Sequence, residues 1–177
     1  HTGDGPGSID LSAALSRADA RAVWRYLPGS INTGARHWVR DALKKGVASE
    51  AKLILKGDLA HFPFLDKRQG QFLVTVKAND VTLDYGTGWP MITGIDADLK
   101  FAGAGMVVEA RRGAILGANL SQTRAEIPDF DAPVSMLKVK GRVEGETAEF
   151  LKYVAQSPVA AQIDHFTENM SASGKGR

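Results

Sequence analysis

The sequence has no cysteine among its 177 residues, which excludes disulfide bonds, thiolate metal sites and cysteine nucleophiles. It also lacks a large excess of charge of either sign, because 22 Lys and Arg residues stand against 20 Asp and Glu residues. This balance argues against a strongly basic nucleic-acid-binding protein. No apolar run approaches the roughly 18 residues that a membrane-spanning helix needs.

The composition that remains is that of a folded, turn-rich protein. Hydrophobic residues make up 44% of the chain and charged residues 24%, both typical of globular domains. The 19 glycines among 177 residues exceed the usual share of about 7% and favour many β-turns. The length predicts a single domain over 1–177. Patterned sequence meets both ends abruptly, so we expect a segment of a longer protein.

The N-terminal part, 9–46, predicts one strand and two helices. Alternating apolar residues predict a strand over 9–15. A helix is expected from about Asp19 to Leu27, ended by Pro28-Gly29. A second helix is expected over 33–45, where apolar residues recur at helical spacing.

From Val47 onward the apolar period changes to two, which predicts antiparallel strands over 47–145 with turns between them. The alternation changes phase near Asn79-Asp80. A one-residue bulge there would keep both apolar sets on one face, and a tight hairpin is the alternative. The C-terminal part, 146–169, is expected to be helical, with a helix over 148–156.

These elements predict an α+β fold. We expect a curved antiparallel sheet of about seven to eight strands, with two N-terminal helices and a C-terminal helix on one face. Such a sheet is roughly 35 Å wide, whereas two adjacent helices cover about 20 Å of it. An apolar strip therefore stays bare unless the C-terminal helix covers it, and the sequence leaves both outcomes open.

Residues capable of catalysis or metal binding form no recognisable motif. The four histidines have no zinc-site spacing, and a GxSxG motif is absent. Asp96 and Asp98 share one strand face, as do Asp80 and Asp84, and they could support a carboxylate-dependent hydrolase. Because they alternate with apolar residues, a solvated sheet face is the favoured interpretation. A basic edge is a further alternative to a mixed charged face, formed by Arg111, Arg112, Lys138, Lys140 and Arg142.

A set of short motifs occurs in a fixed order along the chain. The motifs are Tyr26-Leu27-Pro28, Trp38, Leu55-Lys56-Gly57-Asp58-Leu59, Phe62-Pro63-Phe64, Gly70-Gln71-Phe72, Asp80-Val81-Thr82-Leu83-Asp84-Tyr85, Gly88-Trp89-Pro90, Ala97-Asp98-Leu99-Lys100-Phe101, Leu137-Lys138-Val139-Lys140-Gly141 and Ser157-Pro158. With these motifs, the chain resembles the YhdP-type branch of the AsmA-like proteins from about Ile9 to Gly174.

The resemblance implies a segment of a large Gram-negative envelope protein. Such proteins are anchored in the inner membrane by one N-terminal helix, which this chain lacks, and the rest lies in the periplasm. Their long curved sheets form an apolar groove that shields phospholipid acyl chains during transport and supports the outer-membrane barrier. The family supplies no catalytic residues.

The resemblance and the alternation together predict a non-enzymatic lipid groove without metal or cofactor. Phospholipid and neighbouring segments of the same chain are the expected partners, and nucleic acid is not. The expected lipid contacts are apolar sheet residues: Leu53, Leu55, Phe72, Val74, Val76, Leu99, Phe101, Leu137 and Val139. The alternative function is a structural or assembly module that binds other envelope proteins.

Overall fold

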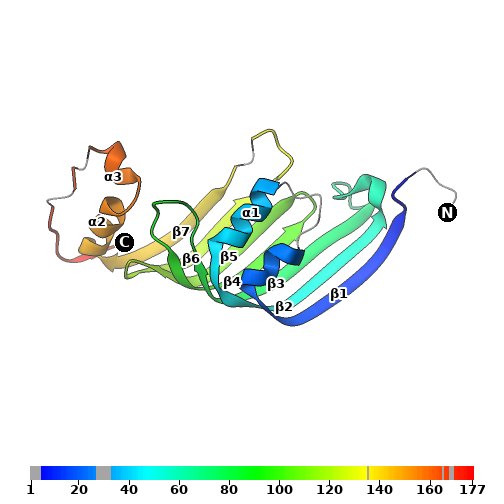
Figure 1. The fold of residues 1–177 in the computed structure, drawn as a ribbon, viewed down its shortest axis with the longest axis horizontal. Helices are drawn as coiled ribbons and strands as arrows, with labels where there is room; N and C mark the ends of the chain where they lie inside the picture. The colour runs from blue at the N-terminus through cyan, green and yellow to red at the C-terminus, as the bar shows by residue number, and fades with distance from the viewer. Residues whose placement is uncertain (1–4, 27–32, 135, 165, 168–169) are drawn as a thin grey trace.

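The fold is an open sheet of eight antiparallel strands, as the sequence predicts (Figure 1). It is seen in a computed structural model that describes residues 5–26, 33–134, 136–164, 166–167 and 170–177. Each strand pairs with its neighbours in sequence, so the sheet is a meander without crossovers. The strands are β1 (Ser8–Asp19), β2 (Leu43–Asp58), β3 (Gly70–Leu83), β4 (Ile92–Ala102), β5 (Gly105–Ile115), β6 (Ala118–Ile127), β7 (Lys138–Glu146) and β8 (Lys175–Gly176).

The change of phase near Asp80 is a β-bulge, and the alternative of a hairpin is wrong. β3 runs through this point, and Asp80 has a φ of 49°. Ala78 pairs with Ala97 and Val81 pairs with Ile95, so β3 has one residue more than β4 between these pairs. Since directly paired residues point to the same face, Val81 continues the apolar face of Ala78.

Other strands carry irregular positions at a similar level of the sheet. The register between β2 and β3 shifts at Glu50, and the register between β6 and β7 shifts at Gln122. Both residues have positive φ angles, as has Gly94 of β4. Bulges increase the local twist of a strand and bend it. Beside these positions, a row of paired residues on the apolar face has only small side chains. The row consists of Ala18, Ala48, Ala78, Ala97, Ala110 and Thr123.

The two predicted N-terminal helices are both present, and the second is shorter than expected. The first is a 3-10 helix, η1 (Ala20–Tyr26), where the Asp19 carboxylate accepts the Arg21 backbone N–H at 2.9 Å. The predicted end at Leu27 and Pro28-Gly29 lies outside the described residues. The second is α1 (Thr33–Ala42), which ends three residues early because Leu43 and Lys45 pair with β3.

The C-terminal helical part contains α2 (Thr147–Ala155) and α3 (Val159–Gln162), near the predicted 148–156. A capping box between Glu146 and Glu149 begins α2. Figure 1 shows α2 and α3 beyond β7, at the end of the sheet. None of the helices in the described part of the chain has the length and apolar character needed to cross a membrane.

An aromatic cluster connects α1 to α2 through the β3–β4 connection. The Trp38 indole N–H donates to the Tyr85 carbonyl at 3.2 Å, and the Tyr85 and Tyr153 hydroxyls lie 3.3 Å apart. Trp89 packs 5.9 Å from the Tyr85 ring and 6.0 Å from the Tyr153 ring. Burial, together with the Tyr153 hydrogen bond, raises the pKa of Tyr85 above its ordinary value.

The buried core is small and lies mainly at the end of the sheet beside η1 and α1. Its members there are Ala20, Ala42, Ala48, Val81 and Ala97. Figure 1 shows both helical elements on this side of the sheet. We call this part of the apolar face the covered half, and the part toward the β2–β3, β4–β5 and β6–β7 connections the open half.

Candidate functional site

The open half carries a continuous apolar surface that crosses seven strands. Strand register places its side chains in three rows on one face. We call this surface the trough. Its rows are Leu11, Leu55 and Phe72; Ala13, Leu53, Val74, Phe101, Met106 and Ile127; and Val76, Leu99, Val108, Ala125 and Val139.

Eight of the nine residues predicted to contact lipid lie in these rows. The register pairs Leu53 with Val74 and Val74 with Phe101, which brings residues from three strands together. Leu137 is different, because it lies just before β7, has no partner in the register and is 58% exposed.

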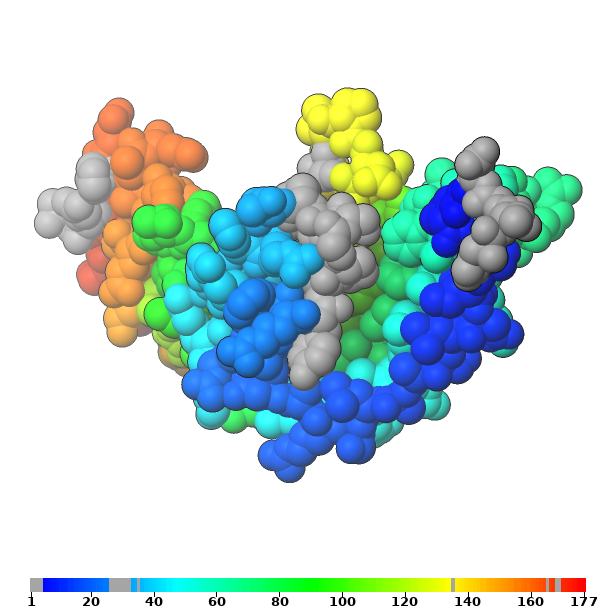
Figure 2. Space-filling model, turned by 45° about the vertical axis from the view of Figure 1, so that its right-hand side comes forward, coloured from blue at the N-terminus to red at the C-terminus, as the bar shows by residue number. Residues whose placement is uncertain are grey.

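The trough is not sealed. None of its side chains is buried, although they face the same side as the buried Ala48 and Ala97. Exposure is largest at the two outer strands, where Leu11 is 40% and Val139 is 58% exposed. Figure 2 shows the molecule hollowed between the η1–α1 side and the β2–β3 connection. This apolar surface is open to solvent along its length.

The β2–β3 connection closes one side of the trough with aromatic rings. It contains the short 3-10 helix η2 (Leu59–His61), followed by Phe62 and Phe64. The Phe62 ring lies 5.3 Å from the ring of Phe72 and 6.0 Å from that of Phe64. Phe64 is only 4% exposed.

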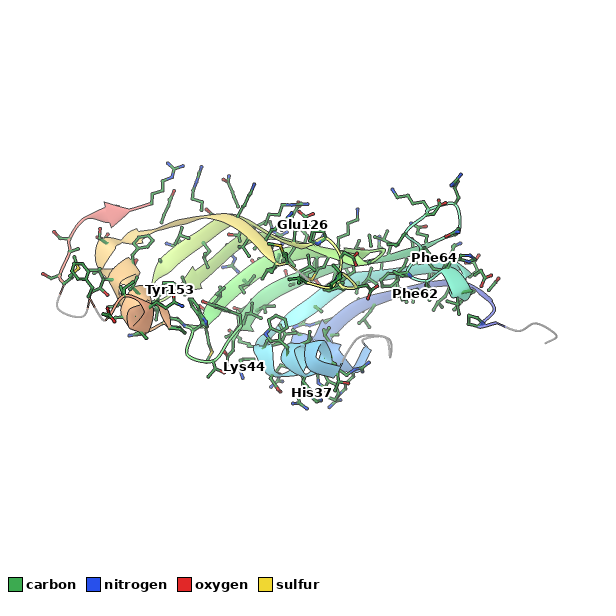
Figure 3. The ribbon with its side chains drawn as sticks, turned by 90° about the horizontal axis from the view of Figure 1, so that it is seen from above. His37, Lys44, Phe62, Phe64, Glu126 and Tyr153 are labelled. Carbon is green, nitrogen blue, oxygen red and sulfur yellow. The ribbon has the colours of Figure 1, made fainter. Side chains whose placement is uncertain are left out.

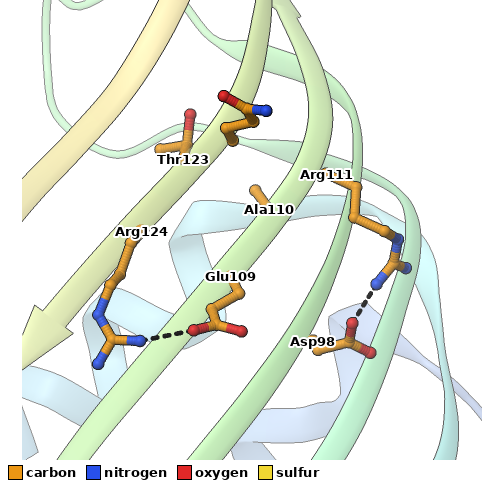
Figure 4. Close-up of a pocket in the computed structure, with 7 residues that line it drawn as sticks. Asp98, Glu109, Ala110, Arg111, Thr123 and Arg124 are labelled. Carbon is orange, nitrogen blue, oxygen red and sulfur yellow. Dashed lines mark hydrogen bonds and ion pairs between the residues drawn. The ribbon is translucent and has the colours of Figure 1, made fainter.

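The opposite face of the sheet carries charged side chains that pair across the strands, beside a short apolar row of Ile54, Leu73 and Ala102. Lys56 binds Asp10 at 2.9 Å and Lys77 binds Glu50 at 2.6 Å. Arg124 donates to Glu109 at 2.5 Å, as Figure 4 shows. These pairs are exposed, so each contributes little to stability. They distinguish this face from the trough, whose rows contain no charged side chain.

The aspartates considered for catalysis belong to this charged face. Arg111 donates to Asp98, and Arg112 donates to Asp96 at 2.5 Å. The Arg112 hydrogen bond, with help from the Asp80 backbone N–H, lowers the pKa of Asp96. A lowered pKa keeps this carboxylate ionised and opposes a role as a general acid.

The predicted basic edge separates into two parts. Arg111 and Arg112 are paired with aspartates, which fits the mixed charged face that the sequence favoured. The other three cations alternate along β7, where Lys138 lies opposite Glu126 and Arg142 lies opposite Ser121.

The hollows outside the trough include two that described residues line. The larger, about 500 Å³, is on the charged side of β4 to β6, and the pairs Asp98–Arg111 and Glu109–Arg124 line it (Figure 4). Its charged groups already satisfy one another. The smaller, about 310 Å³, lies between α2 and the residues Thr167, Met170, Ser171 and Ala172. Among the described residues, no three His, Asp or Glu side chains are grouped so that they could hold a metal ion.

Sequence reasoning missed several trough residues. Met106, Val108 and Ile127 alternate along their strands as Leu99 and Phe101 do, so the same signal could have found them. Phe62 and Phe64 lie in a connection without periodicity. Only the folded turn shows that their rings lie beside Phe72.

Comparison with known proteins adds independent information. The family model described as "YhdP protein" matches residues 1–177. A curated relative, "Intermembrane phospholipid transporter YhdP" of Escherichia coli (strain K12), is 23% identical over 167 residues. The match covers 94% of this chain, which spans 13% of that relative's length. No solved structure matches the chain. Because the family model covers every residue, the chain belongs to the YhdP protein family.

Proposed function

We propose that this chain is a non-enzymatic segment of a bridge protein that shields phospholipid acyl chains between the inner and outer membranes. The observation that carries the proposal is the trough, whose unburied apolar rows cross seven strands without a charged side chain. The relative named as an intermembrane phospholipid transporter supports phospholipid as the cargo.

The energetics favour such a surface as a lipid path. Exposing an acyl chain to water costs about 0.8 kcal/mol of free energy for each CH₂ group, and an apolar sheet face removes most of this cost. Contacts between hydrocarbon and side chains have no fixed direction, so a lipid can slide along the rows without breaking hydrogen bonds.

The size of the trough fits an acyl chain. Six spacings between seven strands give a length of about 29 Å. The hydrocarbon core of a bilayer is about 30 Å thick, so the chains of one leaflet extend about 15 Å. The trough can therefore cover a whole acyl chain that lies across the strands.

The arrangement of the helices belongs to the same proposal. In this proposal η1, α1 and the C-terminal helix all lie on the apolar side of a curved sheet. The trough then lies between these helices and the β2–β3 connection. The position of α2 beyond β7 supports a path that the C-terminal helix leaves open. We place the segment in the periplasm, with the inner-membrane anchor outside 1–177.

Neighbouring segments of the same protein are the proposed partners at the sheet edges. Within the described residues, β1 has no strand on its outer edge, and β8 pairs only with Gly145 and Glu146 of β7. Exposed strand edges readily pair with further strands. A strand added at each edge would lengthen the trough, consistent with a segment of a longer repetitive groove.

Site-specific photocrosslinking in the full-length protein tests the proposal. A photoreactive amino acid at Val74 or Leu99 should give phospholipid adducts in the cell envelope. The matched controls are Thr75 and Lys100, which neighbour these residues on the same strands but point to the charged face. Equal adducts on both faces, or none at Val74 and Leu99, would overturn the proposal. Protein adducts in place of lipid would favour an assembly module.

A further inference from the structure

We infer that Phe62 is a lipid-contacting residue that forms one wall of the trough and positions the acyl chain over the central rows, with Phe64 as its support. The inference rests on the proposed function and assigns a contact that the strand pattern does not contain. It follows from the way the β2–β3 connection folds back over the sheet.

Two opposed glycines make room for this turn. Gly57 pairs with Gly70, and each lies two residues along its strand from Leu55 or Phe72 of the first row. Since alternate residues face the same side, both glycines lie on the trough side of the sheet. A Cβ atom on Gly70 would lie 2.5 Å from Phe64 Cδ1, and one on Gly57 would lie 2.9 Å from Phe64 Cε1. Phe64 therefore occupies the space above the glycine pair and ends the apolar face there.

Phe62 lies between this buried ring and the trough. Its ring meets Phe64 edge-on, at an interplanar angle of 82°, and lies against Phe72 at 60°. Phe72 is part of the first row of the trough. Unlike Phe64, Phe62 is only partly buried, so part of its surface remains available to a ligand. Figure 3 shows Phe62 and Phe64 together at this end of the strands, away from His37 and Lys44 at the other end.

Local hydrogen bonds hold the turn in this position. The Asp58 carboxylate accepts the Ala60 N–H at 3.0 Å, and the Phe64 N–H donates to the His61 carbonyl at 2.7 Å. The Leu59 N–H donates to Gly7 at 2.9 Å, which ties the turn to the start of β1. A partly exposed phenyl ring on a fixed turn offers a large apolar surface and no hydrogen-bonding group, so it suits contact with an acyl chain.

Photocrosslinking in the full-length protein tests the inference. A photoreactive phenylalanine analogue at Phe62 should give phospholipid adducts, as it should at Val74. The matched control is Leu65, in the same connection but 77% exposed. Adducts at Phe62 and Val74 but not at Leu65 are expected.

The other outcomes separate the two claims. Adducts at Val74 without adducts at Phe62 would contradict the role of Phe62 as a wall but would still support the trough as a lipid path. No adducts at Val74 would overturn the proposed function and this inference together. Equal adducts at Phe62 and Leu65 would mean that lipid is not held by the wall, and this would overturn the inference alone.

A substitution series gives a second readout. Phe62→Ala should lower the yield of lipid adducts at Val74 about fourfold, the factor for returning one CH₂ group to water. Phe62→Leu should retain most of the yield because it keeps an apolar side chain at the wall. An unchanged yield in Phe62→Ala would overturn the inference. If Phe62→Ala fails to fold, the adducts at position 62 still decide the question.

Discussion

The covered and open halves of the apolar face share the same apolar alternation, but their side chains differ in size and in their surroundings. Val81 of the covered half is 5% exposed, whereas Val139 at the outer strand of the open half is 58% exposed. Both side chains lie on the apolar side of the sheet. Alternation therefore decides which face is apolar, and the helical cover decides whether that face is core or binding surface.

The covered half must supply much of the stability of the fold. Its buried residues are mostly alanines, and among the described residues no large side chain is completely buried. A core this small leaves little free energy of unfolding to offset a polar or oversized substitution. The open half can accept polar substitutions at lower cost because its side chains already contact water.

The largest expected difference between the halves comes from an aspartate in place of valine. Val81→Asp should lower the free energy of unfolding by about 3 kcal/mol or more, because it buries a charge without a partner. Val139→Asp should change it by only about 0.5 kcal/mol at an exposed position. Urea unfolding followed by circular dichroism measures both. Similar losses in the two variants would contradict the division into halves.

A second difference concerns the row of small residues beside the bulges. Ala97 is 1% exposed, so Ala97→Leu should cost about 1–3 kcal/mol of unfolding free energy through overpacking. Ala102→Leu, on the same strand but exposed, is the matched control and should be nearly neutral. Thermal unfolding of the two variants compares them. A neutral Ala97→Leu would show that the row has room for larger side chains.

The charged face should respond to pH through Asp96. Its pKa is lowered in the folded protein, so its stabilising contribution is present above the unfolded pKa of about 3.9. The contribution is lost as the pH falls through the folded value. Asp96→Asn should therefore flatten the decline of the urea midpoint below pH 4. Asp131→Asn, in the exposed β6–β7 connection, serves as the control, and equal acid profiles in wild type and Asp96→Asn would contradict this role.

The smallest expected effect is at a single exposed ion pair. A double-mutant cycle on Glu109 and Arg124 should give a coupling free energy below about 1 kcal/mol, because both side chains are largely exposed. The coupling should decrease further in high salt. A larger, salt-independent value would mean that the charged face, and not the covered half alone, determines stability.

Much of the fold could be predicted from the sequence because its signals are local. The strand alternation, the bulge at Asp80 and the helix begun by Glu146 and Glu149 each depend on neighbouring residues. The early end of α1 could not be predicted, because the pairing of Leu43 with Leu83 overrides the helical pattern. The lipid contacts of all nine predicted residues stay predictions, although the register places eight of them in the trough and leaves Leu137 outside its rows.

The sequence by itself determined which residues alternate, and hence that one face of a meander would be apolar and the other charged. Only the tertiary structure decided where η1 and α1 lie on that face, and therefore which valines are core and which remain exposed. It also brought Phe62 and Phe64 back over the glycine pair of β2 and β3. The physical reason is that alternation depends on neighbouring residues, whereas coverage depends on elements far apart in the chain.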